Sequence, residues 1–211
     1  MGETPMGRAF TRPERDLVPD DELAVLRELA DRVRELTEAT VLTAVDSAEA
    51  AAVSAEVAAL TARLNARRRE APPFNTTGTG RMGRQIGNPV TGLINPIAPP
   101  VEVEVGDDGI ARAEITLNDA YEGPPTFVHG GVSALILDQV LGMATAAAAG
   151  PAVTAGLELR YRRPTPLGVP LRIEGKASRV EGRRVYAGAT ISDPEGRVTV
   201  EATATFVLLG P

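Results

Sequence analysis

The residues best suited to chemistry lie in one apolar stretch, Phe127 to Gly150 (FVHGGVSALILDQVLGMATAAAAG). It holds the only histidine of the chain, His129, and a single acid, Asp138. A helix that is hydrophobic on nearly every face is normally buried all round. A carboxylate inside such a helix is costly unless it is paired or takes part in a reaction. Asp138 is therefore a candidate catalytic acid, and the alternative is a buried acid that bonds a neighbouring hydroxyl.

Two glycines directly after the histidine, Gly130 and Gly131, point to a second chemical role. Glycine lets the backbone approach a ligand because it has no β-carbon. At the start of a helix, free N–H groups and the helix dipole favour a developing oxyanion. His129 fits such a site as an orienting group, and otherwise it caps the helix or bonds a backbone carbonyl.

The composition limits the classes to which the protein can belong. The 211 residues are 43% hydrophobic and 24% charged, which suits a globular protein with one main domain. With no cysteine and one histidine, disulfides, cysteine nucleophiles and a multi-histidine metal site within one chain are excluded. The net charge of -6 argues against general nucleic-acid binding. No apolar run reaches the roughly 18 residues of a membrane span and no secretory signal is present, so we expect a cytoplasmic protein.

The first part of the chain, residues 1–75, is predicted to be an extension that contains a helical hairpin. Apolar residues at helical spacing predict one helix from Asp21 to about Thr40 and a second from Ser47 to about Arg69. A hairpin of this size buries little surface alone, so it should pack on the rest of the protein or on a second subunit.

Residues 76–100 are rich in Gly and Pro and predict a long connection. The run from Gly78 to Gly83 matches G-x-G-x-x-G, the pattern of dinucleotide-binding loops. Such a loop must follow a strand and open a helix. Because prolines precede this run and IGNPVTG follows it, we do not expect nucleotide binding there.

Residues 101–211 predict an antiparallel sheet around the apolar helix, in the order ββαββββ. The period of two and the turn residues indicate strands at 101–105, 110–117, 153–163, 171–180, 184–192 and 197–208. The fold class is therefore α+β, with one long central helix.

The segments YEGPPTFVHGGVSALILDQVLGMA and VTAGLELRYRRPTPLG resemble the PaaI-type hotdog-fold acyl-CoA thioesterase family. The subgroup that contains the human thioesterase superfamily members 4 and 5 is the most similar. The resemblance covers about Asn88 to Leu209. It depends on His-Gly-Gly, an acid nine residues after the histidine, a threonine sixteen later and then Tyr-x-Arg-Pro.

The resemblance implies a hotdog fold and hydrolysis of an acyl-CoA. Asp138 then activates a water or attacks the thioester carbonyl itself, and Thr154 holds the water. His129 and the N–H of Gly130 or Gly131 polarise the carbonyl. The resemblance also implies a homodimer or tetramer, with Thr154 reaching Asp138 of the other subunit. Neither a metal nor a cofactor is expected, since coenzyme A enters only as part of substrate and product.

Basic residues gather between Glu158 and Arg184, where eight basic residues face three acidic ones. We expect Arg160 and Arg162 to point out of the sheet, with Arg183 and Arg184 close by on the next hairpin. Arginine forks suit phosphate, so these four residues are predicted to bind the phosphates of coenzyme A. The alternative is a solvated, arginine-rich sheet face.

One position departs from the family pattern. Many PaaI-type enzymes have an asparagine six residues before the histidine, and this chain has Gly123. Three other functions stay open on the sequence: a non-catalytic acyl-CoA-binding or regulatory module, a hotdog enoyl-CoA hydratase, and a serine hydrolase. The last needs G-x-S-x-G, and the run from Gly131 fails at Leu135.

Overall fold

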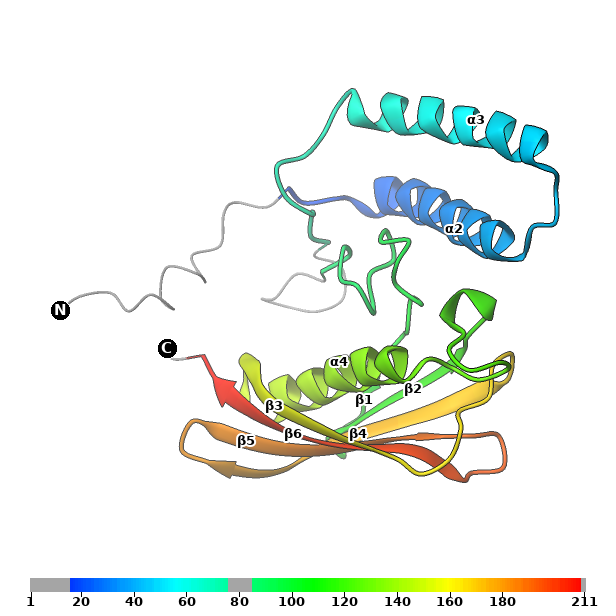
Figure 1. Cartoon of the computed structure of the whole chain (residues 1–211). Coiled ribbons are helices and arrows are strands. Elements are labelled where there is room, and N and C mark those ends of the chain that lie inside the picture. Colours follow the sequence, from blue (N-terminus) through cyan, green and yellow to red (C-terminus); the bar gives the residue numbers. More distant parts are fainter. Residues whose placement is uncertain (1–15, 76–84, 210–211) are drawn as a thin grey trace.

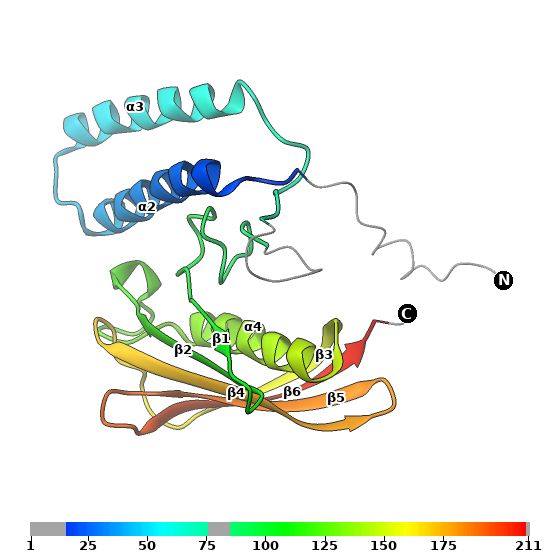
Figure 2. The same ribbon diagram turned by 180° about the vertical axis from the view of Figure 1, so that it is seen from behind.

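The computed structural model describes residues 16–75 and 85–209. Its described part contains a six-stranded antiparallel sheet in the order β1-β2-β4-β5-β6-β3, with a long helix across one face (Figures 1 and 2). In chain order the elements of this body are β1 (Glu104–Val105), β2 (Ile110–Thr116), the 3-10 helix η1 (Asp119–Tyr121), α4 (Gly130–Ala149), β3 (Ala152–Tyr161), β4 (Pro170–Glu181), β5 (Arg184–Ser192) and β6 (Val198–Leu208). The hotdog fold and the ββαββββ order are confirmed. The Gly78 to Gly83 match lies outside the described residues.

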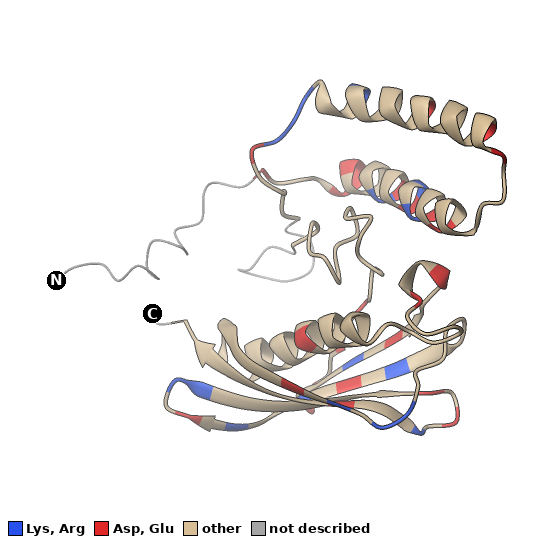
Figure 3. Cartoon of the chain, viewed as in Figure 1, with Lys and Arg blue, Asp and Glu red and all other residues tan. Residues whose placement is uncertain are grey.

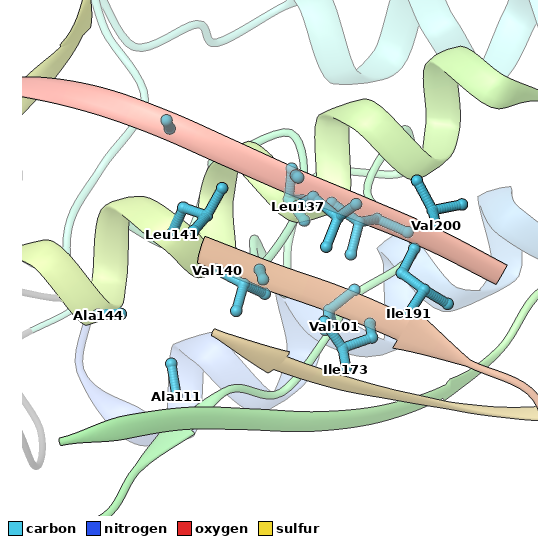
Figure 4. Packing of buried hydrophobic residues seen from close by; sticks show 14 of the residues in the cluster. Val101, Ala111, Leu137, Val140, Leu141, Ala144, Ile173, Ile191 and Val200 are labelled. Carbon is cyan, nitrogen blue, oxygen red and sulfur yellow. The ribbon is translucent and has the colours of Figure 1, made fainter. Parts of the chain in front are cut away.

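Helix α4 lies against the sheet along one buried side. The buried residues of helix and sheet form one cluster, in which Figure 4 labels Leu137, Val140, Leu141, Ile173 and Ile191. A glycine at 175 on β4 permits this close approach, because a β-carbon there would lie 2.9 Å from Cγ1 of Val140. Among the described residues, α4 is the one helix whose length and mean hydropathy of 1.6 would suit a membrane span. Because its apolar side packs on the sheet, α4 serves as the core helix of the fold.

The strands alternate as the sequence predicts. On β5, Val185, Ala187, Ala189 and Ile191 are buried beneath α4, and the residues between them lie on the opposite face of the sheet. The prediction of a first strand over 101–105 is too long. The N–H of Val101 bonds the carbonyl of Val90 in the connecting segment, so this end of the run is buried without joining the ladder.

The first helix of the extension, α2 (Asp20–Leu42), is attached to the segment that precedes the sheet. Ala30 is buried, and the guanidinium of Arg34 donates hydrogen bonds of 2.8 to 3.2 Å to four backbone carbonyls between residues 92 and 98. That segment is attached to α4 in turn, since the amide of Asn88 donates to Gln139 at 3.0 Å. The expectation that this helix packs on the rest of the protein is confirmed.

The second helix, α3 (Ser47–Asn65), lies farther from the sheet than α2 does (Figures 1 and 2). It ends before the predicted Arg69. None of its residues is buried, and the stripe predicted to pack is largely exposed at Val53, Leu60 and Leu64. Within the described chain, α2 therefore packs on the rest of the protein and α3 does not, so packing of α3 on a second subunit stays a prediction.

Candidate active site

The candidate acid, Asp138, is joined to β3 by one hydrogen bond. The hydroxyl of Thr154 donates to Oδ1 of Asp138 at 2.9 Å. Both residues belong to the same chain, so the implied reach of Thr154 to Asp138 of another subunit is not what the structure shows. Thr154 faces the helix because it pairs with the buried Phe206, and a β-bulge directly follows it, between Thr154 and Gly156. Bulges of this kind re-aim a side chain and are common beside active sites.

The carboxylate of Asp138 keeps one oxygen open. Asp138 is half-buried, and among the described residues it forms no ion pair. Its Oδ1 accepts from Thr154, and Oδ2 has no protein donor within the described part of the chain. A carboxylate held on one side and open on the other can accept a hydrogen bond from a water and then its proton.

His129 is the N-cap of α4. Its Nδ1 accepts a hydrogen bond from the N–H of Gly131 at 3.0 Å, so in the neutral ring the hydrogen lies on Nε2. The ring lies over Gly131, where a β-carbon would be 3.1 Å from Nδ1. His129 therefore does cap the helix, as the alternative predicted, but the cap uses only Nδ1 and leaves Nε2 free within the described residues.

Two donors remain at the positive end of α4. The N–H of Gly130 and the Nε2–H of His129 have no acceptor in the described part of the chain, and His129 is exposed. The N–H of Gly131 is already used by the cap. Of the two glycine donors that the sequence left open, Gly130 is the one available to a ligand. Such a pair of donors suits an oxyanion.

Gly123 lies against the histidine backbone. A β-carbon at this position would be 2.7 Å from Cα of His129 and 3.1 Å from its Cβ. The loop is held closed by the N–H of Gly123, which donates to the carbonyl of Phe127 at 2.9 Å, and by the N–H of His129, which donates to Tyr121. An asparagine, the residue of many relatives, therefore has no room here. The loop supports His129 through its backbone instead.

We expect Gly123→Ala to lower the free energy of unfolding by about 1–3 kcal/mol, because the added carbon forces His129 and its loop apart. Thermal unfolding of parent and variant measures this as a lower Tm. Gly188→Ala is the matched control, since a β-carbon there meets no atom closer than 3.8 Å. An equal Tm for Gly123→Ala and the parent would contradict the close contact between Gly123 and His129.

The site has two halves, the base Asp138 and the pair of donors at Gly130 and His129, and these lie at different positions along the axis of α4. From Gly130 to Asp138 the helix rises about 12 Å, at about 1.5 Å per residue. The carbon and oxygen of a carbonyl group are only about 1.2 Å apart. A base and an oxyanion donor must each come within about 3 Å of the reacting group or of its water. One copy of α4 therefore does not bring both halves to one carbonyl.

The predicted cluster of four arginines does not form. Arg160 pairs with Glu158 at 3.1 Å, and Arg162 pairs with Glu201 at 2.8 Å, near the end of β3. The hydrogen bond from Arg162 lowers the pKa of Glu201 below its ordinary value. Figure 3 shows acidic and basic residues interspersed along the strands and turns of the sheet.

Arg183 and Arg184 lie at the other end of the sheet. Arg184 is paired in register with Val207, whereas Tyr161 is paired with Val200. Seven residues of β6 separate these positions, about 23 Å at about 3.3 Å per residue. Arg183 donates to the carbonyl of Leu208 at 2.8 Å. The expectation that the two pairs lie close together is wrong, because the hairpin turn places Arg183 at the far end of its strand.

The structure adds one contact at the start of α4 that the sequence analysis missed. The hydroxyl of Tyr161 donates to the carbonyl of Gly130 at 2.9 Å. The Tyr-x-Arg-Pro spacing was the available signal, although strand alternation alone does not reveal which atom the hydroxyl of Tyr161 bonds. Within the described residues, no group of three or more His, Asp or Glu side chains could hold a metal ion.

Comparison with known proteins gives consistent matches. The family model described as Thioesterase superfamily matches residues 126–200. The chain is 38% identical over 91 residues to the acyl-coenzyme A thioesterase THEM4 of Xenopus laevis, which is 43% of this chain and 41% of that protein. It is also 38% identical over 91 residues to THEM4 of Mus musculus, covering 43% of this chain and 39% of the mouse protein. The chain thus spans less than half the length of these two relatives.

One solved structure matches over nearly the whole chain. It is the crystal structure of a thioesterase superfamily protein, 36% identical, with a TM-score of 0.80. The match covers 87% of this chain and 90% of that one, so it includes most of the N-terminal extension as well as the sheet and α4.

Proposed function

Because the chain belongs to the thioesterase superfamily, we propose that it hydrolyses the thioester of an acyl-CoA to a free acid and coenzyme A. The observation that carries this proposal is the bond of 2.9 Å from Thr154 to one oxygen of Asp138, which leaves the other oxygen open beside an exposed strand edge. The names of the two THEM4 relatives support the substrate class.

Asp138 is the base of the proposed reaction. Its carboxylate takes a proton from a water whose oxygen attacks the carbonyl carbon, and the carbon–sulfur bond then breaks to release the thiol. In the other route the carboxylate attacks the carbonyl carbon itself, the carbon–sulfur bond breaks, and coenzyme A leaves as the thiolate, which takes a proton from water. A water molecule then hydrolyses the resulting anhydride to the free acid and the carboxylate of Asp138. Thr154 keeps the carboxylate oriented in both routes.

The start of α4 stabilises the negative charge that forms on the thioester oxygen. The N–H of Gly130 and the Nε2–H of His129 have no acceptor in the described part of the chain and are free to donate to the thioester oxygen. The positive end of the helix dipole adds to their effect. Removal of one donor from such a site typically costs about 10²–10³ in rate.

We propose further that two copies of the chain complete each site. The halves lie about 12 Å apart on one α4, so a second α4 must supply the missing half. The open edge of the sheet fits this arrangement, because β3 is an edge strand whose residues Thr154, Ala155 and Gly156 are exposed. An exposed edge of this kind is a template for pairing with another chain. A two-fold axis there gives two identical sites, each with Asp138 of one copy and Gly130 of the other.

The phosphates of coenzyme A are assigned to Arg183 and Arg184. Arg160 and Arg162 have their charges compensated by Glu158 and Glu201, whereas Arg183 bonds only a carbonyl. Arg184 forms no ion pair within the described part of the chain. Uncompensated guanidinium groups bind phosphate with the least competition.

We expect the double variant Arg183→Glu, Arg184→Glu to raise KM for an acyl-CoA about 10-fold or more, since two attractive charges become repulsive. KM for the matching acyl-pantetheine, which lacks the nucleotide, should change less than twofold. The double variant Arg160→Glu, Arg162→Glu is the control. Equal effects of the first pair on both substrates would contradict the assignment.

The proposed activity is tested by release of free thiol over a panel of acyl-CoA substrates of different chain length and aryl character. We expect turnover with at least one substrate and one acid formed per thiol. Binding of acyl-CoA without thiol release would instead support the non-catalytic module. Hydration of an enoyl-CoA without thiol release would support the hydratase.

A further inference from the structure

The residue Tyr161, near the end of β3, contacts the start of α4 through its hydroxyl and its ring. The hydroxyl donates to the carbonyl of Gly130 at 2.9 Å. A β-carbon on Gly130 would lie 3.1 Å from that hydroxyl oxygen and 3.2 Å from two ring carbons. The side chain therefore covers Gly130 closely, and any larger residue there would displace it.

The peptide group between Gly130 and Gly131 takes part in two hydrogen bonds at once. Its carbonyl oxygen accepts from Tyr161 at 2.9 Å, and its N–H donates to Nδ1 of His129 at 3.0 Å. A peptide that accepts at its oxygen becomes a better donor at its nitrogen, because successive hydrogen bonds polarise one another. The tyrosine hydroxyl is thus connected to the imidazole ring through one peptide.

We infer that Tyr161 is a positioning residue that acts through this peptide to hold the His129 ring with its hydrogen on Nε2. The inference rests on the proposed function, since the Nε2–H is there the donor to the thioester oxygen. Tyr161 itself does not touch the reacting atoms in this arrangement.

The backbone around the ring explains why a tyrosine is needed. On the near side, His129 donates its N–H to Tyr121 and Val128 donates its N–H to Thr165, so the loop is held by the fold. After the ring, Gly130 and Gly131 begin the first turn of α4, where the carbonyl of His129 accepts from Val132 and Ser133. Glycines have the weakest conformational preference of all residues, so this turn is held less firmly than one of other residues. In addition to the helix bonds, Tyr161 is the side chain that holds the carbonyl of the peptide between Gly130 and Gly131.

If that peptide rotates, its N–H no longer faces Nδ1. The neutral ring is then free to exchange its hydrogen between the two nitrogens. In the tautomer with hydrogen on Nδ1, Nε2 is an acceptor and offers nothing to a developing negative charge. The loss should therefore appear in the chemical step more than in substrate binding.

The test is Tyr161→Phe, which keeps the ring over Gly130 and removes only the hydroxyl. We expect kcat to fall about 3- to 10-fold, the typical worth of one hydrogen bond. KM should stay within about twofold, because the substrate loses no direct contact. Tyr186→Phe is the matched control, since Tyr186 lies on β5 under the guanidinium of Arg179, 4.3 Å from its ring centre.

The second readout is nitrogen NMR of protein labelled with ¹⁵N-histidine, recorded without substrate. The chain has one histidine, so the two ring signals are assigned without ambiguity. In the neutral ring, the parent should show an unprotonated Nδ1 and a protonated Nε2. In Tyr161→Phe both signals should move toward their average, and in Tyr186→Phe they should not.

The NMR readout does not depend on thioesterase activity, so the inference and the proposed function fail separately. Ring signals in Tyr161→Phe that equal those of the parent would overturn the inference, whatever the effect on kcat. A lower Tm with unchanged ring signals would likewise show that Tyr161 only supports the strand. Shifted signals in a chain that hydrolyses no thioester would uphold the contact and refute the proposed reaction.

Discussion

Asp138→Asn is expected to lower kcat for acyl-CoA hydrolysis by about 10²–10⁴-fold, the usual contribution of a positioned general base. Asparagine has the same shape as aspartate, and its amide oxygen still accepts the bond from Thr154. The fold should therefore be kept and only the proton acceptor lost. KM should change little, because the carboxylate acts on the water or the carbonyl carbon and does not bind coenzyme A. Thiol release at saturating substrate measures the effect.

Asp107→Asn provides the matched control, since the same chemical change is made in the exposed turn between β1 and β2. It should keep the activity of the parent. If Asp138→Asn turned over acyl-CoA as fast as the parent, Asp138 would be the structural acid that the sequence left as its alternative.

The second large effect is expected at His129. His129→Ala should lower kcat by about 10²-fold or more, since the alanine has no donor for the thioester oxygen. It should also lower stability by about 1 kcal/mol, because the cap of α4 is lost. These two roles need separate variants.

His129→Asn separates them. Asparagine is among the best capping residues, and its side-chain oxygen accepts from the first turn of the helix. Its short amide does not reach the place of Nε2. We expect a Tm close to that of the parent with kcat still reduced, measured by thermal unfolding and thiol release on the same samples. If His129→Asn had both the Tm and the kcat of the parent, His129 would act only as the cap.

Local pattern was enough to predict the sheet, the core helix and the elements that carry the site. The buried alternation on β5 and the apolar run of α4 each follow from side-chain period alone. His129, Asp138 and Thr154 were placed on the right elements for the same reason. The hydrogen bond between the last two joins them within one chain, whereas the resemblance implied a contact between two subunits.

What the sequence did not predict depends on contacts between distant segments. Arg183 was expected close to Arg162 because it lies on the next hairpin along the chain, but strand register places the two at opposite ends of the sheet. Val101 continued a strand pattern, yet its N–H bonds Val90 instead. Neither register nor such loop contacts are encoded in a local period.

The glycines show the same limit at the site itself. The sequence marked Gly123 as a departure from the family, and only the structure shows that His129 occupies the space of its side chain. The sequence offered Gly130 and Gly131 as equal donors. The histidine cap removes Gly131 from that pair. The space around Gly123 and the hydrogen-bond partner of Gly131 determine these two outcomes, and a sequence pattern shows neither.

The central claim is that each site takes Asp138 from one copy of the chain and the start of α4 from another. Co-expression of Asp138→Asn and His129→Asn chains in equal amounts tests it most directly. Half of the dimers then carry one of each chain, and each of these has one site with both native residues, so about one quarter of the parent activity should return. A mixture no more active than either variant alone would contradict the claim.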